Sequence, residues 1–511
     1  MSKIDDVFEL VKSLTKNEKR FFKIFSKRHG EKDDLKYLQL FDIYDSFAVF
    51  EKENIEQEIR IKNLTNIRNI KHQLNLQILR CLNTYHYQKT IENEVFNHLQ
   101  NGQILFEKGL FNHAYKAINQ AKNLAKKHNL NLLLLDCLKK EKQIARELYI
   151  KEKIEYFASE GLSEEKELLN QYLKTCETLH LRNQLILTSR ESKNIDKNQL
   201  KLQTKAIENQ VLALKIDENT SFENAEAALI TQSYFYISNQ DFKSAAEVQQ
   251  QLKELYKIYP EQIELQHSNY LSALYNLMVS CLILKKFEKV ETILNTINAY
   301  RLKQNSRLVN LKLFTYLNIG LAFYNKKGDF VKSSSYETDI NQGLINFNNA
   351  IHDFAKVSLH LHLTVSFIGV KNYEKATFWV NKLLNELHSK SIATHLLIGK
   401  ILSLIIAFEQ KKFTYLNFIT KQYINEIDLV ENRPKSLDLL IGFFYSNNFD
   451  ELTKSETKKL LEKLKLDLNN LFVDSNEKII VEVFDVLSWI DSNIYNQSFE
   501  YLIKIKFNNN L

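Results

Sequence analysis

Three histidines come closest to the spacing of a metal site. His352, His360 and His362 lie in one helical pattern, with Asp353 as the nearest acid. His360 and His362 are two residues apart, so on a helix their rings point to different faces. His352 lies about two turns before His360, which is too far for ligands of one ion, and Asp353 points elsewhere. The pattern favours ordinary structural histidines, and we expect neither a metal nor another cofactor.

Signatures of catalytic chemistry are missing from the sequence. There is no GxGxxG, GxxxxGKS/T, GxSxG or HExxH motif, and 10 glycines in 511 residues leave no glycine-rich phosphate loop. Acidic residues are spread over every helical pattern, so no pair of carboxylates stands out as a general acid and base. The sequence therefore predicts that the protein is not an enzyme.

A basic run near the N-terminus suggests a different chemistry. Spacings of three and four residues place its members on one broad face of a helix: Lys16, Lys19, Arg20, Lys23 and Lys27. Such a face can contact DNA phosphates, but no recognition helix with base-reading side chains follows it. The opposite face carries phenylalanines, so a solvated amphipathic helix is the preferred interpretation. The net charge of +7 permits nucleic-acid binding without arguing for it.

The four cysteines indicate the compartment. Cys81, Cys137, Cys176 and Cys281 lie far apart, each in an apolar helical pattern, which predicts buried free thiols rather than disulfides or a metal site. Free thiols agree with a reducing environment. The N-terminus carries acids and no apolar signal core, and no apolar run approaches the roughly 18 residues of a membrane span. We expect a cytoplasmic protein without membrane contact.

The elements that hold these residues are predicted to be helical hairpins. In residues 101–125, Gly109 ends one helix, because glycine readily adopts a left-handed conformation, and Phe111 stands in the turn. Ala114 and Ala121 follow at helical spacing and let a neighbouring helix come close. Aromatic residues recur at similar turns, with spacings of 45, 43, 43 and 40 residues between them, at Phe242, Phe287, Phe330, Tyr373 and Phe413.

These hairpins resemble the tetratricopeptide (TPR) repeat, in which small residues flank a turn with glycine and an aromatic residue. The Trp and the closing Pro of that pattern are absent here, and the spacing exceeds the roughly 34 residues of a TPR unit, so the helices are expected to be longer. The resemblance implies an all-α, right-handed superhelical solenoid of antiparallel hairpins. Only 2 prolines and the absence of linkers in a chain of this length fit a solenoid. The alternative is an irregular all-α protein with coincidental turns.

Five segments are expected along the chain. They are a helical bundle over residues 1–90, a first hairpin over 91–128, divergent hairpins over 129–220, repeats over 221–454, and C-terminal helices with a cap over 455–511. The opening SLTKNEKRFFKIF, followed by a helix from Tyr37 to Phe41, resembles the start of uncharacterised bacterial TPR-like proteins. That resemblance implies a family but no activity. A bundle there could cover the open end of a solenoid.

The inner surface is the best candidate for function. In TPR-like stacks the first helix of each hairpin lines the concave side, and the register places polar tips there at Tyr234, Tyr275, Asn318, Asn325 and Lys326. The register also places apolar residues there that alternatively pack on a neighbouring helix: Ile237, Val279, Val365 and Ile368. We expect a non-catalytic scaffold or adaptor that binds a protein or peptide. The alternative is a transcriptional or signalling regulator, with residues 1–90 as the effector module and the repeats as a peptide sensor.

Overall fold

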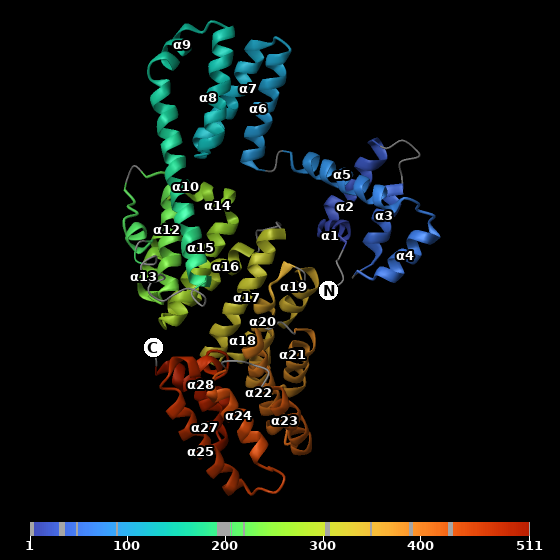
Figure 1. The fold of residues 1–511 in the computed structure, drawn as a ribbon, viewed down its shortest axis with the longest axis vertical. Coiled ribbons are helices and arrows are strands. Elements are labelled where there is room, and N and C mark those ends of the chain that lie inside the picture. The colour runs from blue at the N-terminus through green and yellow to red at the C-terminus, as the bar shows by residue number, and fades with distance from the viewer. Residues whose placement is uncertain are drawn as a thin grey trace. The chain divides into compact units, whose positions relative to one another are not determined.

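A computed structural model gives the chain an all-helical architecture (Figure 1). It describes residues 5–29, 36–47, 50–87, 90–191, 205, 207–217, 220–301, 307–347, 350–387, 392–427 and 433–509. No strand occurs in these ranges, so the prediction of an all-α protein is confirmed for them. The chain divides into two compact units, which are coarser than the five predicted segments. Unit 1 is Met1–Thr231 with Leu255–Gln266, and unit 2 is Gln232–Glu254 with His267–Leu511.

Unit 1 begins with a bundle of short helices. Thr15 and Glu18 form a capping box, with the Thr15 amide 2.8 Å from a Glu18 carboxylate oxygen. Asp5 caps the first helix, and Ser2, which the sequence also offers as a cap, lies outside the described residues. Phe22 and Phe41 meet in the bundle core. The helices are α1 (Asp6–Ser13), α2 (Lys16–His29), α3 (Lys36–Ser46), α4 (Lys52–Ile61) and α5 (Ile67–His86).

The first predicted hairpin follows the bundle. It consists of α6 (Ile91–Glu107) and α7 (Phe111–Lys127), which pack on each other. Ala114 and Ala121 are fully buried, and Gly102 lies against Ile118, so small residues bring the two helices together as predicted. The divergent segment contains α8 (Asn131–Glu147), α9 (Lys151–Ala158) and α10 (Gly161–Glu191).

One turn geometry recurs through the chain. Each of the six predicted turn aromatics is the first residue of a helix, which confirms their placement. The residue two positions before each aromatic has a positive φ, at Gly109, Gln240, Lys285, Gly328, Lys371 and Lys411. In each turn an amide bonds to the carbonyl five residues earlier, as in Lys286 to Cys281, and this closes the helix end. The same geometry precedes α8 and α9, at Asn129 and Tyr149, without an aromatic residue.

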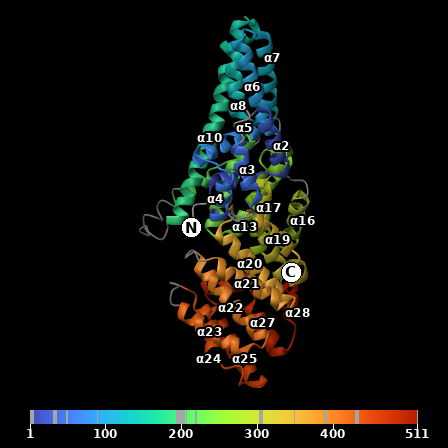
Figure 2. The ribbon, with the colours of Figure 1, turned by 90° about the vertical axis from the view of Figure 1, so that its right-hand side faces the viewer.

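Unit 2 contains successive hairpins, which follow one another from α20 to α25 in Figure 2. We call the leading helices of these hairpins the first helices; α15, α17, α20, α22 and α24 each contact the next one. The first helices are α12 (Phe222–Ser238), α15 (His267–Ile283), α17 (Arg307–Lys327), α20 (Asp353–Gly369), α22 (Ala393–Glu409) and α24 (Lys435–Ser446).

The second helices of the hairpins pack between these. They are α13 (Phe242–Ile258), α16 (Phe287–Arg301), α18 (Phe330–Ser334) with α19 (Glu337–Phe347), α21 (Tyr373–Glu386), α23 (Phe413–Ile427) and α25 (Lys454–Leu471). For example, α21 contacts both α20 and α22. The unit boundary passes through α12 and α13, and α14 (Pro260–Leu265) belongs to unit 1.

The C-terminal helices fold back along unit 2. They are η3 (Ser475–Lys478), α26 (Ile479–Val483), α27 (Val486–Tyr495) and α28 (Phe499–Asn508), and together residues 475–508 are called the return segment. We expected the last stretch to cap the final hairpin. Instead α28 packs on α17. The Phe507 ring of α28 also lies 4.3 Å, between ring centroids, from Phe287 at the start of α16. The apolar residues of α28 therefore bury against a hairpin far back along the chain.

Candidate functional site

The first helices of unit 2 differ in how much of their surface is covered. In α20 and α22 nearly every residue of the C-terminal half is buried, so both helices are covered on all sides. In α15 and α17 a face remains half-exposed, and it carries Ser272, Tyr275, Lys312 and Tyr316. The inner surface predicted for partner binding is therefore open at α15 and α17 and covered at α20 and α22.

The return segment provides part of that cover. Its η3 turn contacts α24, where the Ser436 amide donates to a Glu477 carboxylate oxygen at 2.7 Å and the Ser436 hydroxyl donates to the Glu477 carbonyl at 2.8 Å. Next along the segment, α26 contacts α20, and Ile480 and Phe484 are fully buried. Further on, the Trp489 indole donates to Glu409 at the end of α22 at 2.7 Å. The return segment thus covers part of α20, α22 and α24.

The residues predicted to contact a partner differ in their burial and in their hydrogen bonds. Tyr234 is half-buried on α12, and Asn318 accepts a hydrogen bond from Ser358 on the next first helix at 2.8 Å. Asn325 is buried, and its amide donates to the His362 carbonyl at 2.8 Å while its oxygen accepts from serines on α18 and α20. Its placement on the partner surface is therefore corrected, because its polar tip is used inside the protein.

Lys326 lies where the cover begins. It is exposed to solvent, yet burial by the surrounding protein lowers its pKa, while the carboxylates of Glu482 and Asp485 act in the opposite direction. Of the apolar residues predicted on the inner side, Val365 and Ile368 are buried in the core, whereas Ile237 and Val279 are half-exposed.

Tyr275 belongs to a cluster of side chains that stack on and hydrogen-bond to one another on the open face. Its ring stacks on Tyr316 with centroids 4.3 Å apart and planes 21° apart. The Tyr316 hydroxyl lies 3.1 Å from the Ser272 hydroxyl, and the Lys312 ammonium donates to Ser272 at 2.9 Å and to the Ser268 carbonyl at 3.0 Å. Burial lowers the pKa of Lys312 and raises the pKa of both tyrosines. We call Ser272, Tyr275, Lys312 and Tyr316 the tyrosine–lysine cluster.

Sequence reasoning missed three members of this cluster. It identified Tyr275 but chose Asn318 on α17, because the repeat register was carried across at the spacing of the turns. The helices meet at Tyr316 instead, two residues earlier. A usable signal was present, since Ser268, Ser272 and Tyr275 on one helix and Lys312 and Tyr316 on the other are spaced three or four residues apart, as residues on one helix face are.

The two close histidines lie on different faces of α20, as predicted. The His360 ring lies 5.3 Å from Trp379 on α21, between centroids, whereas His362 lies on the side of Lys326 on α17. Burial lowers the pKa of each to about 4, so both are neutral at physiological pH. Within the described ranges, no group of three or more potential metal ligands comes together.

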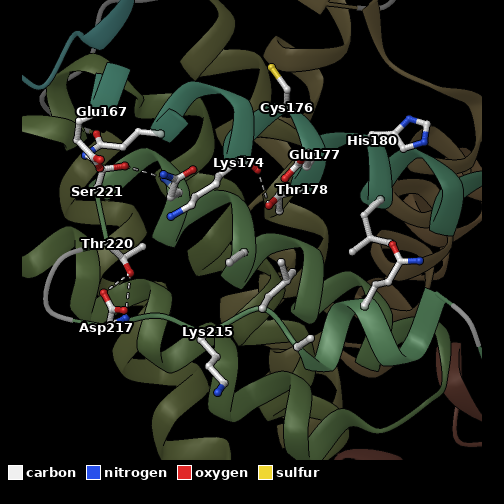
Figure 3. A pocket seen from close by; sticks show the side chains of 17 residues that line it. Glu167, Lys174, Cys176, Glu177, Thr178, His180, Lys215, Asp217, Thr220 and Ser221 are labelled. Atoms are coloured by element: carbon white, nitrogen blue, oxygen red, sulfur yellow. Dashed lines mark hydrogen bonds between the residues drawn. The ribbon is translucent and has the colours of Figure 1, made fainter. Parts of the chain in front are cut away.

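Unit 1 contains a cavity of about 950 Å³ lined by α10, α12 and residues within 210–217 and 220–221. Its polar side chains bond locally: Thr220 donates to Asp217 at 2.9 Å, and the Asn224 amide donates to Ser221 at 3.4 Å. Figure 3 shows His180 well apart from Glu167 and Asp217 on the cavity wall. These groups do not converge on one point, so the cavity shows no arrangement of acid, base and nucleophile.

The basic face of α2 is partly neutralised. Lys19 pairs with Asp45 at 2.6 Å and Lys23 with Asp42 at 2.8 Å, so both side chains point to α3. Lys16, Arg20 and Lys27 are exposed. Fewer cations are therefore directed to solvent than the sequence pattern indicated.

Comparisons with known proteins supply no family for this chain: no family model matches it, and no curated protein matches it significantly. Across the part of the chain that the structure describes, no helix is both long enough and apolar enough to cross a membrane. The arguments for function therefore come from the geometry of the inner face.

Proposed function

We propose that the chain is a TPR-like solenoid that acts as a non-catalytic cytoplasmic scaffold or adaptor and binds a protein or peptide on its inner face. The observation that carries this proposal is the tyrosine–lysine cluster, which remains half-exposed where α15 meets α17. Tyrosines at such positions provide apolar area and a hydroxyl with little side-chain entropy to lose, and they are enriched in protein interfaces.

The chemistry of the cluster supports a macromolecular partner. Its polar groups are a lysine, a serine and two phenols, which recognise hydrogen-bonding and charged groups but supply neither a nucleophile with a base nor a metal site. The stacked rings lie on adjacent first helices, so a bound segment would cross the hairpins. The regulator alternative is less favoured, because two of the five lysines and arginines predicted to face DNA pair with aspartates on α3.

The test compares two tyrosines. Tyr275→Ala removes half of the stacked pair on α15, and Tyr415→Ala removes an exposed tyrosine on the second helix α23. Proteins captured from native lysate by each tagged variant are identified by mass spectrometry. We expect a protein that is retained by the wild type and by Tyr415→Ala to be lost from Tyr275→Ala. If both variants retain the same proteins at the same yield, the inner face is not the binding surface.

A further inference from the structure

Helix α17 carries a lysine at each end of one face. Lys312 and Lys326 are fourteen residues apart, which is close to four helical turns and roughly 21 Å along the axis. Near Lys326, the carboxylates of Glu482 and Asp485 in the return segment raise its pKa against the effect of burial, although Asp485 itself pairs with Lys506 on α28. Lys312 donates to two neutral oxygens, of Ser268 and Ser272, and no carboxylate of the described residues pairs with it. Acidic groups therefore lie toward the Lys326 end of the face, whereas the ammonium of Lys312 has only neutral partners among the described residues.

The part of the return segment whose carboxylates act on Lys326 combines acidic and apolar residues. Between residues 477 and 486 it reads EKIIVEVFDV, with three acids interspersed among large apolar residues. Ile480 and Phe484 are buried, while Glu482 remains exposed. Apolar side chains therefore enter the core, and carboxylates stay near the lysine. This part of the return segment packs on α20 and α24, and its carboxylates act on a first-helix lysine at a distance.

The open end offers the same chemistry without an occupant from the described chain. The Lys312 ammonium has three donors, and two are used by the oxygens named above, which leaves one for a ligand. The Tyr275–Tyr316 stack beside it provides the apolar contact. A single unpaired lysine suits one carboxylate, whereas a nucleic-acid backbone would need a row of cations.

We propose that the tyrosine–lysine cluster binds an internal acidic–hydrophobic segment of a partner protein, with a carboxylate side chain on Lys312 and a large apolar side chain on the Tyr275–Tyr316 stack. This proposal rests on the proposed function and specifies the partner's chemistry. The partner segment would lie on the part of α17 that carries Lys312, whereas α28 packs on α17 and lies against Gly328, just after its C-terminal end.

The probe is a fluorescein-labelled peptide with the sequence EKIIVEVFDV, and binding to the full chain is measured by fluorescence anisotropy. Lys312→Glu and Lys312→Met should weaken binding roughly tenfold or more, since a hydrogen bond between charged groups is lost. Lys421→Glu on the second helix α23 makes the same charge change on an exposed site and should leave binding unchanged. A peptide with Gln and Asn in place of its acids should bind as weakly to the wild type as the acidic peptide binds to Lys312→Met.

Folding of each variant is checked by the urea midpoint of tryptophan fluorescence, and Lys312→Met, which keeps the apolar stem, serves if Lys312→Glu unfolds. The proposal is overturned if the peptide does not bind, or if Lys326→Glu weakens binding while Lys312→Met does not, because the peptide would then replace the return segment. If Tyr275→Ala loses a cellular partner but Lys312→Met keeps it, the scaffold function stands and the acidic chemistry is wrong.

Discussion

The buried histidines of α20 predict how the stability of unit 2 depends on pH. His360 and His362 are 1% and 7% exposed, and one ring nitrogen of each has no hydrogen-bond partner among the described residues. Burial lowers both pKa values from 6.5 to about 4, and nearby lysines act in the same direction: Lys356 and Lys382 on His360, and Lys326 on His362. The folded state therefore resists protonation that the unfolded state accepts.

The sign and size follow from proton linkage. Between pH 6.5 and about pH 4 the unfolded chain binds a proton at each histidine and the folded chain does not, so stability falls as the pH falls. The contribution of the two histidines to stability is fully present above pH 6.5. From pH 7.5 to pH 5.0 the loss is about 2 kcal/mol for each histidine, at about 1.4 kcal/mol per pH unit below 6.5. Over this pH range the two histidines together should therefore lower the free energy of unfolding by about 4 kcal/mol.

The assay uses the two tryptophans of the chain. Trp379 and Trp489 both belong to unit 2, so urea unfolding followed by tryptophan fluorescence reports on this unit. The double variant His360→Leu with His362→Leu should lose most of the histidine contribution and fall less steeply with pH than the wild type. His352→Leu, at the exposed N-terminal cap of the same helix, is the control and should behave like the wild type. An equally steep fall in the double variant would refute the reasoning.

Two further predictions concern packing and thiol chemistry. Gly369→Ala would place a methyl group into the ring of buried Phe330 and should destabilise unit 2 by about 1–3 kcal/mol in urea unfolding. The control Gly442→Ala, on α24 with open space around it, should be neutral or stabilise by up to about 1 kcal/mol. Equal effects of the two substitutions would contradict the packing described. Among the cysteines, a thiol reagent should modify Cys176 first in the native protein, because the other three are buried. Burial also raises the pKa values of those three thiols, to about 11 for Cys81 and about 12 for Cys137. Mass spectrometry should show that Cys176→Ser lacks the fast phase of modification.

Local sequence determined the helices and most of their ends. The spacing of apolar residues gave the all-α class, and the turn aromatics marked helix starts because they follow a residue in the left-handed conformation. That conformation depends on a few neighbouring residues, so it can be predicted from the local sequence. Where the same turn lacks an aromatic residue, before α9, the sequence shows one continuous helical pattern over residues 130–157 and does not mark the break.

Tertiary structure alone decided which faces of those helices are open. The sequence placed Tyr275, Asn325 and Lys326 on one predicted surface, yet Asn325 is buried, and Lys326 lies beside acids of the return segment. It could not indicate that α28 packs on α17, because an apolar helix face fits many partners and its spacing does not say which. That Lys312 has only neutral partners among the described residues depends on the same long-range packing. A helical pattern tells which side chains share a face, whereas the cover of that face is set by contacts between residues far apart in the chain.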